Sequence, residues 1–218
     1  MSEVKIIKSF CNICFNETDH YVRFDHRTSD SQDIDGGRYS VEWASYYTFL
    51  ECCGCADVSV RRRDWCSEYD RGDYVETFIP PRVTRRKPSF FGDLPVNHQD
   101  LLDEVYTALH VKSRRLALMG ARTLIDIFIA ENVGDQGTFG AGMKVLKERG
   151  YISEAHKAVI ESVIEAGSAA AHRGYDPSAE VTNAVMDIVE NLIHHSVLSG
   201  SADLLRRSTP PRPPRCKK

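Results

Sequence analysis

The spacing of apolar residues along this chain changes near residue 97. Before that point, apolar and polar residues partly alternate in segments rich in aromatic and β-branched side chains, which is typical of strands. After it, apolar residues recur every three or four positions, which predicts amphipathic helices. The pattern therefore predicts an α+β protein, with a small β-rich domain over residues 1–80 and a helical bundle over residues 97–200.

Three segments of the first part have strand character: HYVRF (20–24), RYSVEWASYYTFL (38–50) and DVSVRRR (57–63). Between the first two lies TSDSQDIDGG (28–37), whose Asp and Gly residues predict a turn. Pro80 and Pro81 end the pattern, because proline cannot donate a ladder hydrogen bond. Residues 81–96 are polar and interrupted by further prolines, so we expect a linker there.

About five helices are predicted in the second part, over 97–111, 113–134, 140–150, 153–174 and 176–200. Ser113 and Ser153 are suited to N-cap positions, and Gly150 to a C-cap. Short connections between so many helices favour an antiparallel bundle. The residues expected in its core are Leu102, Val105, Leu109, Leu116, Leu124, Ile127, Phe128, Leu146, Ile160, Ile164, Val185, Ile188, Val189 and Leu192.

Composition places the chain among soluble globular proteins. It has 218 residues, of which 42% are hydrophobic, and no apolar run reaches the length of about 18 residues that a membrane helix needs. The first residues lack the apolar segment of a signal peptide, so we expect a cytoplasmic protein that does not contact membranes. Residues 201–218 are basic and proline-rich, and we expect them to be a disordered tail.

Positive charge is concentrated in short segments, although the net charge of -3 gives no general attraction to nucleic acid. Arginine and lysine clusters can contact phosphates, and they can equally form a solvated face. The residues predicted to contact nucleic acid are Arg61, Arg62, Arg63, Arg85, Arg86 and Lys87.

Five of the seven cysteines lie between residues 11 and 55. Because cytoplasmic thiols stay reduced, this clustering favours a metal site over disulfides. Cys11 and Cys14 form one Cys-x-x-Cys pair, and Cys52 and Cys55 form another. Two such pairs supply the four thiolates of a closed, structural zinc site, so we expect a zinc ribbon with an unusually long spacer between its knuckles. Gly54 is expected to help the second turn through a positive φ.

Other assignments of these residues stay open. Reduced cysteines in a small β core, or a redox pair, are the alternatives to zinc. Cys53 is expected to pack against the sheet, with a pairing to Cys55 as its alternative. Cys66, His20 and His26 are reserve ligands for which ordinary structural or surface roles are favoured. Since a four-thiolate site has no open coordination position, it does not activate water, and the function must be sought elsewhere.

Four segments of the helical part carry a family resemblance: LPVNHQDLLDEVYTAL, RRLALMGARTLIDIFI, LKERGYIS and IEAGSAAAHRG. Over residues 94–198 the chain resembles an uncharacterised bacterial family of domains of unknown function, which is found beside restriction-endonuclease modules and behind N-terminal zinc ribbons. That family is similar in layout to the helical HEPN proteins, many of which act in defence against phage. The resemblance implies a helical bundle and a role in bacterial defence.

HEPN ribonucleases carry an arginine shortly before a catalytic histidine. At the matching place this chain has VIEAGSAAAH, which supplies His172. Ser168 stands where an asparagine is common, and Ile164 or Glu165 stands where the arginine is expected. Because a cation beside the scissile phosphate stabilises the developing charge, its loss counts against catalysis. His172 is then expected to bond the last carbonyls of its helix.

Two functions follow from these features. The first is a non-catalytic module in which a zinc ribbon and a helical bundle bind nucleic acid or a protein partner in a bacterial defence system. The alternative is a HEPN-like, metal-independent ribonuclease that uses His172. The missing arginine favours the binding module, so we do not expect an enzyme. A homodimer is a further hypothesis, because apolar residues occur on nearly every side of ARTLIDIFIA (121–130).

Overall fold

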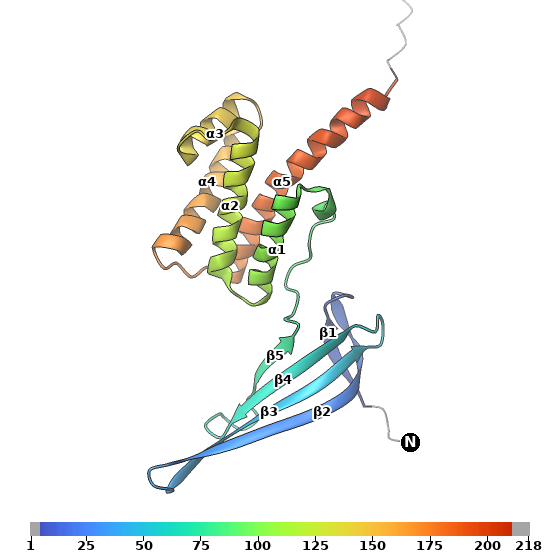
Figure 1. Ribbon diagram of the computed structural model, residues 1–218, viewed down its shortest axis with the longest axis vertical. Helices are drawn as coiled ribbons and strands as arrows, with labels where there is room; N and C mark the ends of the chain where they lie inside the picture. The colour runs from blue at the N-terminus through green and yellow to red at the C-terminus, as the bar shows by residue number, and fades with distance from the viewer. Residues whose placement is uncertain (1–4, 211–218) are drawn as a thin grey trace, which may run out of the picture. The chain divides into compact units, whose positions relative to one another are not determined.

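The computed structural model describes residues 5–210, the side chains of residues 199 and 203 excepted. The chain forms two compact units, the first ending at Thr84 and the second beginning at Arg85. The first is an antiparallel sheet and the second consists of helices (Figure 1). The predicted α+β class with about five helices is confirmed.

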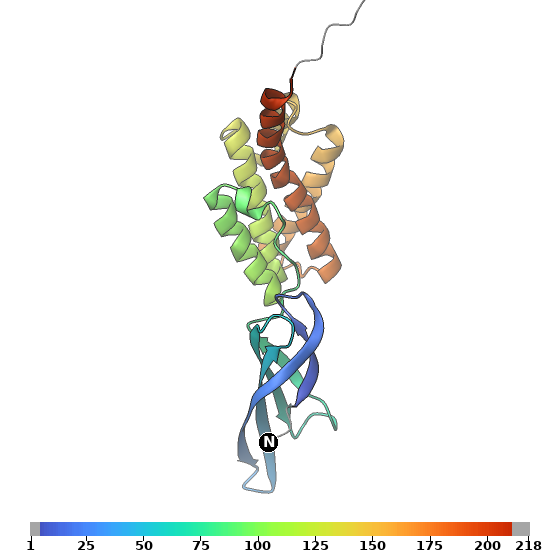
Figure 2. The same ribbon diagram turned by 90° about the vertical axis from the view of Figure 1, so that its right-hand side faces the viewer.

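Each strand of the β unit pairs with the next strand along the chain, all in antiparallel orientation. The strands cross with a pronounced twist (Figure 2). Asp35, Gly36 and Gly37 all have positive φ at the tip of the long β2–β3 hairpin, which suits glycine. In chain order the strands are β1 (Ile6–Cys11), β2 (Asn16–Ile34), β3 (Tyr39–Cys52), β4 (Val58–Cys66) and β5 (Val75–Ile79).

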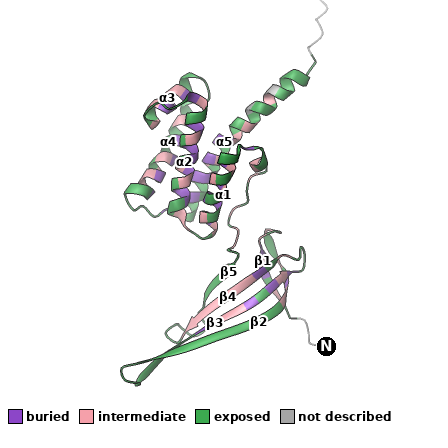
Figure 3. Cartoon of the chain, in the orientation of Figure 1, coloured by how far each residue is buried: buried purple, intermediate pink, exposed green. Residues whose placement is uncertain are grey.

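The core of the β unit lies on one face of the sheet, which we call the inner face. It is defined by alternate residues of β3: Ala44, Thr48, Leu50 and Cys52 are all buried. The opposite, outer face carries Phe49, which is more exposed. Most of β2 is also exposed (Figure 3). Little apolar surface is therefore buried here, and small domains of this kind commonly need a metal or disulfides for stability.

The helical unit is built around α2, which contacts all four other helices. Leu124 of α2 is fully buried, as predicted, whereas Leu116 near its start is 60% exposed, so the core prediction for Leu116 is wrong. Most apolar side chains of α2 are buried, but Leu116 and Met119 remain exposed. The helices are α1 (Val96–His110), α2 (Arg114–Val133), α3 (Phe139–Glu148), α4 (Glu154–His172) and α5 (Ala179–Ser208).

Glycines lie at three of the contacts that α2 makes. A Cβ added at Gly120 of α2 would collide with Val105 of α1, and one added at Gly142 of α3 would collide with Ile129 of α2. A Cβ at Gly167 of α4 would lie 3.1 Å from the carbonyl oxygen of a residue in α2. The absence of side chains at these positions lets the neighbouring helices approach α2 closely.

The last helix is longer than expected. It ends at Ser208, so part of the tail predicted to be disordered from residue 201 is helical, while residues 211–218 lie outside the described part. A single glycine such as Gly200 costs a helix only about 1 kcal/mol, and the Ala, Leu and Arg residues that follow favour helix. Leu204 and Leu205 are exposed there, where α5 projects from the other helices (Figure 1).

The segment before α1 belongs to the helical unit and packs onto its helices. A short 3-10 helix, η1 (Phe91–Asp93), forms within it. The ring of Phe90 stacks on His194 of α5, with the ring centroids 4.1 Å apart.

Among the helices of residues 5–210, none combines the length and apolar character needed to cross a bilayer.

Candidate metal centre

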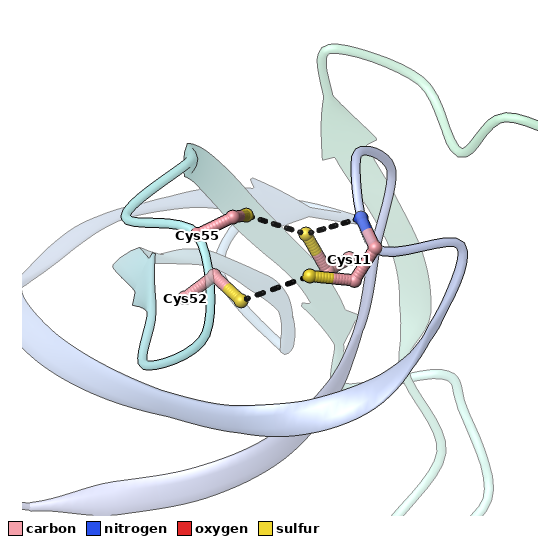
Figure 4. Close-up of side chains that lie close together, drawn as sticks. Cys11, Cys52 and Cys55 are labelled. Carbon is pink, nitrogen blue, oxygen red and sulfur yellow. Dashed lines mark hydrogen bonds between the residues drawn. The ribbon is translucent and has the colours of Figure 1, made fainter.

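Four cysteine sulfurs converge at one end of the β unit (Figure 4). The Sγ atoms of Cys11, Cys14, Cys52 and Cys55 all lie within 4.8 Å of one another. The Cys11–Cys55 pair is separated by 3.4 Å and the Cys14–Cys52 pair by 3.9 Å. Tetrahedral metal–sulfur bonds of about 2.3 Å require sulfurs about 3.8 Å apart, whereas a disulfide requires about 2.05 Å. The cluster therefore fits a metal ion.

The meander brings the two cysteine pairs together. The first pair lies at the turn from β1 to β2, and the second at the turn from β3 to β4. In an antiparallel meander these two turns lie at the same end of the sheet. The pairing of β2 with β3 then sets His20 opposite Cys52. The long spacer is thus folded into a hairpin that returns the chain to the metal site.

Both knuckles use the same backbone turn. The Phe15 amide donates to the Cys11 carbonyl at 2.8 Å, and the Ala56 amide donates to the Cys52 carbonyl at 2.9 Å. Phe15 and Ala56 have φ values of 54° and 61°, so positive φ occurs directly after the second cysteine of each pair. The prediction of a positive φ at Gly54 is wrong, because the turn closes two residues later than expected.

Hydrogen-bond donors surround the sulfur of Cys52. The Thr18 hydroxyl lies 3.2 Å from it, and the Gly54 amide donates to it at 3.4 Å. Burial raises the pKa of Cys52, but these bonds, together with those from neighbouring cysteines, outweigh burial and lower the pKa to about 6. Such donors stabilise a thiolate, which is the form that binds metal.

The pKa of Cys14 is shifted in the opposite direction. Its hydrogen bond to Cys55, followed by burial, raises the pKa of Cys14 to about 12. Four neighbouring thiols cannot all ionise without a compensating cation, because like charges oppose one another. A divalent ion would supply that charge and allow all four to act as thiolates.

The remaining candidate ligands lie outside the cluster. Cys53 is exposed, so the prediction that it packs against the sheet is wrong; β3 ends at Cys52, and the strand alternation ends with it. Cys66 lies at the far end of β4, and His26 lies on the exposed hairpin. His20 is buried, and its Nδ1 lies 3.0 Å from a backbone carbonyl oxygen.

The three consecutive arginines of β4 separate onto the two faces of the sheet, since strand side chains alternate. Arg62 is on the outer face, where its Nε donates to Asp64 at 2.8 Å and its guanidinium lies over the Tyr47 ring. Arg61 and Arg63 are on the inner face. Both have a buried Nε without a hydrogen-bond partner among the described residues. Burial, and then the charge of Arg63, lowers the pKa of Arg61.

The second basic cluster belongs to the helical unit. Arg85 donates to both carboxylate oxygens of Glu190, and Lys87 forms an ion pair with Asp103. Arg86 lies between them in the chain. These contacts give Arg85 and Lys87 a role in holding the segment before α1 against the helices. Contacts of this cluster with nucleic acid stay a prediction.

His172 is the last residue of α4 and is exposed. One turn earlier, the Ser168 hydroxyl accepts a hydrogen bond from Arg122 Nη1 at 2.6 Å. Arg122 Nε also lies 3.8 Å from Asp126. An arginine from α2 therefore lies near the histidine's helix, although the local motif lacks one. Because Arg122 is far from His172 in the sequence, the motif that contains His172 does not by itself reveal this arginine.

Comparison with known proteins gives a family match that lies within the helical unit. Residues 103–208 match a family described as a domain of unknown function, DUF4145. The match extends from within α1 to the end of α5 and does not include the cysteine cluster. This part of the chain is thus similar to an uncharacterised domain family, as expected from its sequence. No curated protein and no solved structure matches the chain.

Proposed function

We propose that this protein is a non-catalytic binding module whose β unit holds a structural zinc ion and contacts nucleic acid through Arg61 and Arg63 of β4. The observation that carries this proposal is the pair Arg61 and Arg63, whose buried Nε groups lack hydrogen-bond partners among the described residues. Unpaired buried donors are costly, and an anion supplied by a ligand would satisfy them.

Zinc is favoured by the chemistry of the ligands. Four thiolates in a tetrahedral arrangement are typical of structural zinc sites. All four positions around the ion would be taken by Cys11, Cys14, Cys52 and Cys55, so no water could be activated there. The role that follows is to hold the two turns together and fix the sheet, and with it the positions of the arginines.

Nucleic acid is favoured over a protein partner by the kind of cation involved. Guanidinium groups match phosphate oxygens in planar, paired geometry. On the outer face Arg62 is already neutralised by Asp64, whereas on the inner face Arg63 forms no ion pair among residues 5–210. Glu76 lies opposite Arg63 in the β4–β5 register but is ion-paired with Arg61. The unneutralised charge is therefore on the inner face.

The test is a binding assay with the zinc-loaded full chain and labelled RNA and DNA, single- and double-stranded, at several salt concentrations. We expect affinity to fall as salt rises, because phosphate contacts release counterions. The double variant Arg61→Gln/Arg63→Gln should bind about tenfold more weakly or worse. Lys144→Gln, an exposed charge on α3, is the matched control and should bind normally.

Absence of binding to every oligonucleotide at low salt would refute the proposal. The same samples are to be examined for cleavage on denaturing gels. RNA cleavage that disappears in a folded His172→Ala variant would replace the binding module with a ribonuclease.

A further inference from the structure

A hollow of about 310 Å³ opens in the β unit beside β2, β3 and β4. Most of the side chains that line it are polar or charged. The side chains that matter for its chemistry are Lys5, Asp25, Arg27, Tyr46, Thr48 and Arg63.

The strand register explains how two arginines reach the hollow. Arg27 of β2 pairs with Tyr46 of β3, and Tyr46 pairs with Arg63 of β4. Residues paired across antiparallel strands share a face, and neighbouring strands lie about 4.8 Å apart. Arg27 and Arg63 therefore flank Tyr46 on the inner face, each one strand away from it.

Aromatic rings hold both guanidinium groups without neutralising them. Arg27 lies over the Tyr46 ring, 5.5 Å from its centroid, and Arg63 lies over Tyr74 at 5.2 Å. Stacking occupies the face of a guanidinium and leaves its edge N–H groups available as donors. The two side chains are thus positioned in advance for a ligand that accepts several hydrogen bonds.

The charges around the hollow do not balance. Lys5 Nζ lies 3.4 Å from Asp25 Oδ2, so these two charges neutralise each other. The other nearby carboxylate, Glu76, lies 4.0 Å from the Nε of Arg61. Arg27 and Arg63 form no ion pair with a carboxylate of the described residues. Two positive charges on stacked, oriented groups are left over.

We propose that this hollow is an anion site that takes one phosphate group between Arg27 and Arg63. The inference rests on the proposed function and makes it specific, since it names the atoms that would receive a phosphate. A phosphate offers several oxygens to two guanidinium edges and supplies the missing negative charge. The same chemistry is present in the phosphodiester of a nucleic acid strand and in free inorganic phosphate.

Inorganic phosphate is the first probe, titrated into the zinc-loaded full chain by calorimetry against sodium chloride of equal ionic strength. The second probe is a single-stranded oligothymidylate, measured with and without competing phosphate. Arg63→Gln and Arg27→Gln are expected to weaken phosphate binding about tenfold or more. Arg62→Gln is the matched control, because the Arg62 side chain lies on the outer face. This variant should change the affinity for phosphate less than about twofold. Arg27 is exposed, so Arg27→Gln separates loss of the site from loss of the fold.

The outcomes distinguish this inference from the proposed function. Binding of both probes, with competition between them, supports both. Phosphate binding without binding of any RNA or DNA oligonucleotide supports the site, assigns it to free phosphate and overturns the nucleic-acid function. Oligonucleotide binding that is unaffected by Arg27→Gln and Arg63→Gln overturns the site alone. Absence of binding to phosphate and to every RNA and DNA oligonucleotide overturns both.

Discussion

Arg85 and Glu190 form a two-pronged ion pair in the helical unit. Arg85 Nε donates to one carboxylate oxygen at 2.6 Å, and Nη2 donates to the other at 2.8 Å. The Tyr106 hydroxyl also donates to Glu190, at 2.5 Å. Burial and then this carboxylate raise the pKa of Tyr106, so its hydroxyl remains a donor at neutral pH. The pair thereby joins the segment before α1 to both α1 and α5.

Replacing Glu190 by alanine should destabilise the helical unit by about 3 kcal/mol, because Arg85 and Tyr106 lose their shared partner in a mostly buried place. Urea unfolding followed by circular dichroism measures this change. Glu148→Ala removes an exposed partner of Lys144 and should cost less than about 0.5 kcal/mol. Equal effects of the two variants would show that the Arg85–Glu190 pair does not stabilise the unit.

Leu124 and Leu116 lie on the same helix in opposite surroundings. Leu124 is fully buried, so Leu124→Ala should cost about 2–5 kcal/mol through lost burial and a cavity. Leu116 is exposed, so Leu116→Ala should change the unfolding free energy by less than about 0.5 kcal/mol. A small effect at Leu124 in the same unfolding assay would contradict its place at the centre of the bundle.

The contact between α2 and α4 depends on Gly167. In Gly167→Ala the new Cβ would lie 2.9 Å from the Cβ of Arg122, so we expect a loss of about 1–3 kcal/mol from overpacking. Gly140 in α3 has nothing within 4 Å of such a Cβ, and Gly140→Ala should instead stabilise the protein by about 0.5–1 kcal/mol. Thermal unfolding of both variants provides the comparison, and stabilisation by Gly167→Ala would contradict the close approach.

The cysteine cluster should bind one zinc ion per chain. Elemental analysis of metal-replete protein measures the ratio, and Cys55→Ser should lower it sharply, since one of four thiolates is lost. Cys53→Ser is the matched control, because the exposed Cys53 thiol lies outside the cluster. Retention of full zinc content in Cys55→Ser would contradict the assignment.

The Thr18 hydroxyl should strengthen metal binding through its contact with Cys52. Thr18→Val keeps the shape of the side chain but removes the donor, and should weaken zinc affinity about 10- to 100-fold. A competition titration with a coloured chelator measures the change. Thr28→Val, at an exposed position of the same strand, should leave the affinity unaltered.

The sequence by itself determined the order of the two units and the four cysteines that converge. Both follow from local signals. A three-to-four residue period predicts a helix wherever it occurs, and a Cys-x-x-Cys turn aims two sulfurs at one point. The hairpin between the knuckles was also predictable, because Gly36 and Gly37 mark its tip.

Only the tertiary structure decided which charged side chains form ion pairs and which do not. Arg85 is far along the chain from its partner Glu190, and the residues near Arg85 in the sequence do not predict that pairing. The alternation along β4 separates Arg62 from Arg61 and Arg63, but the packing of the sheet decides which face is inward. The physical reason is that burial and ion pairing depend on side chains brought together by the fold, whereas periodicity and turn chemistry depend on neighbours in the chain.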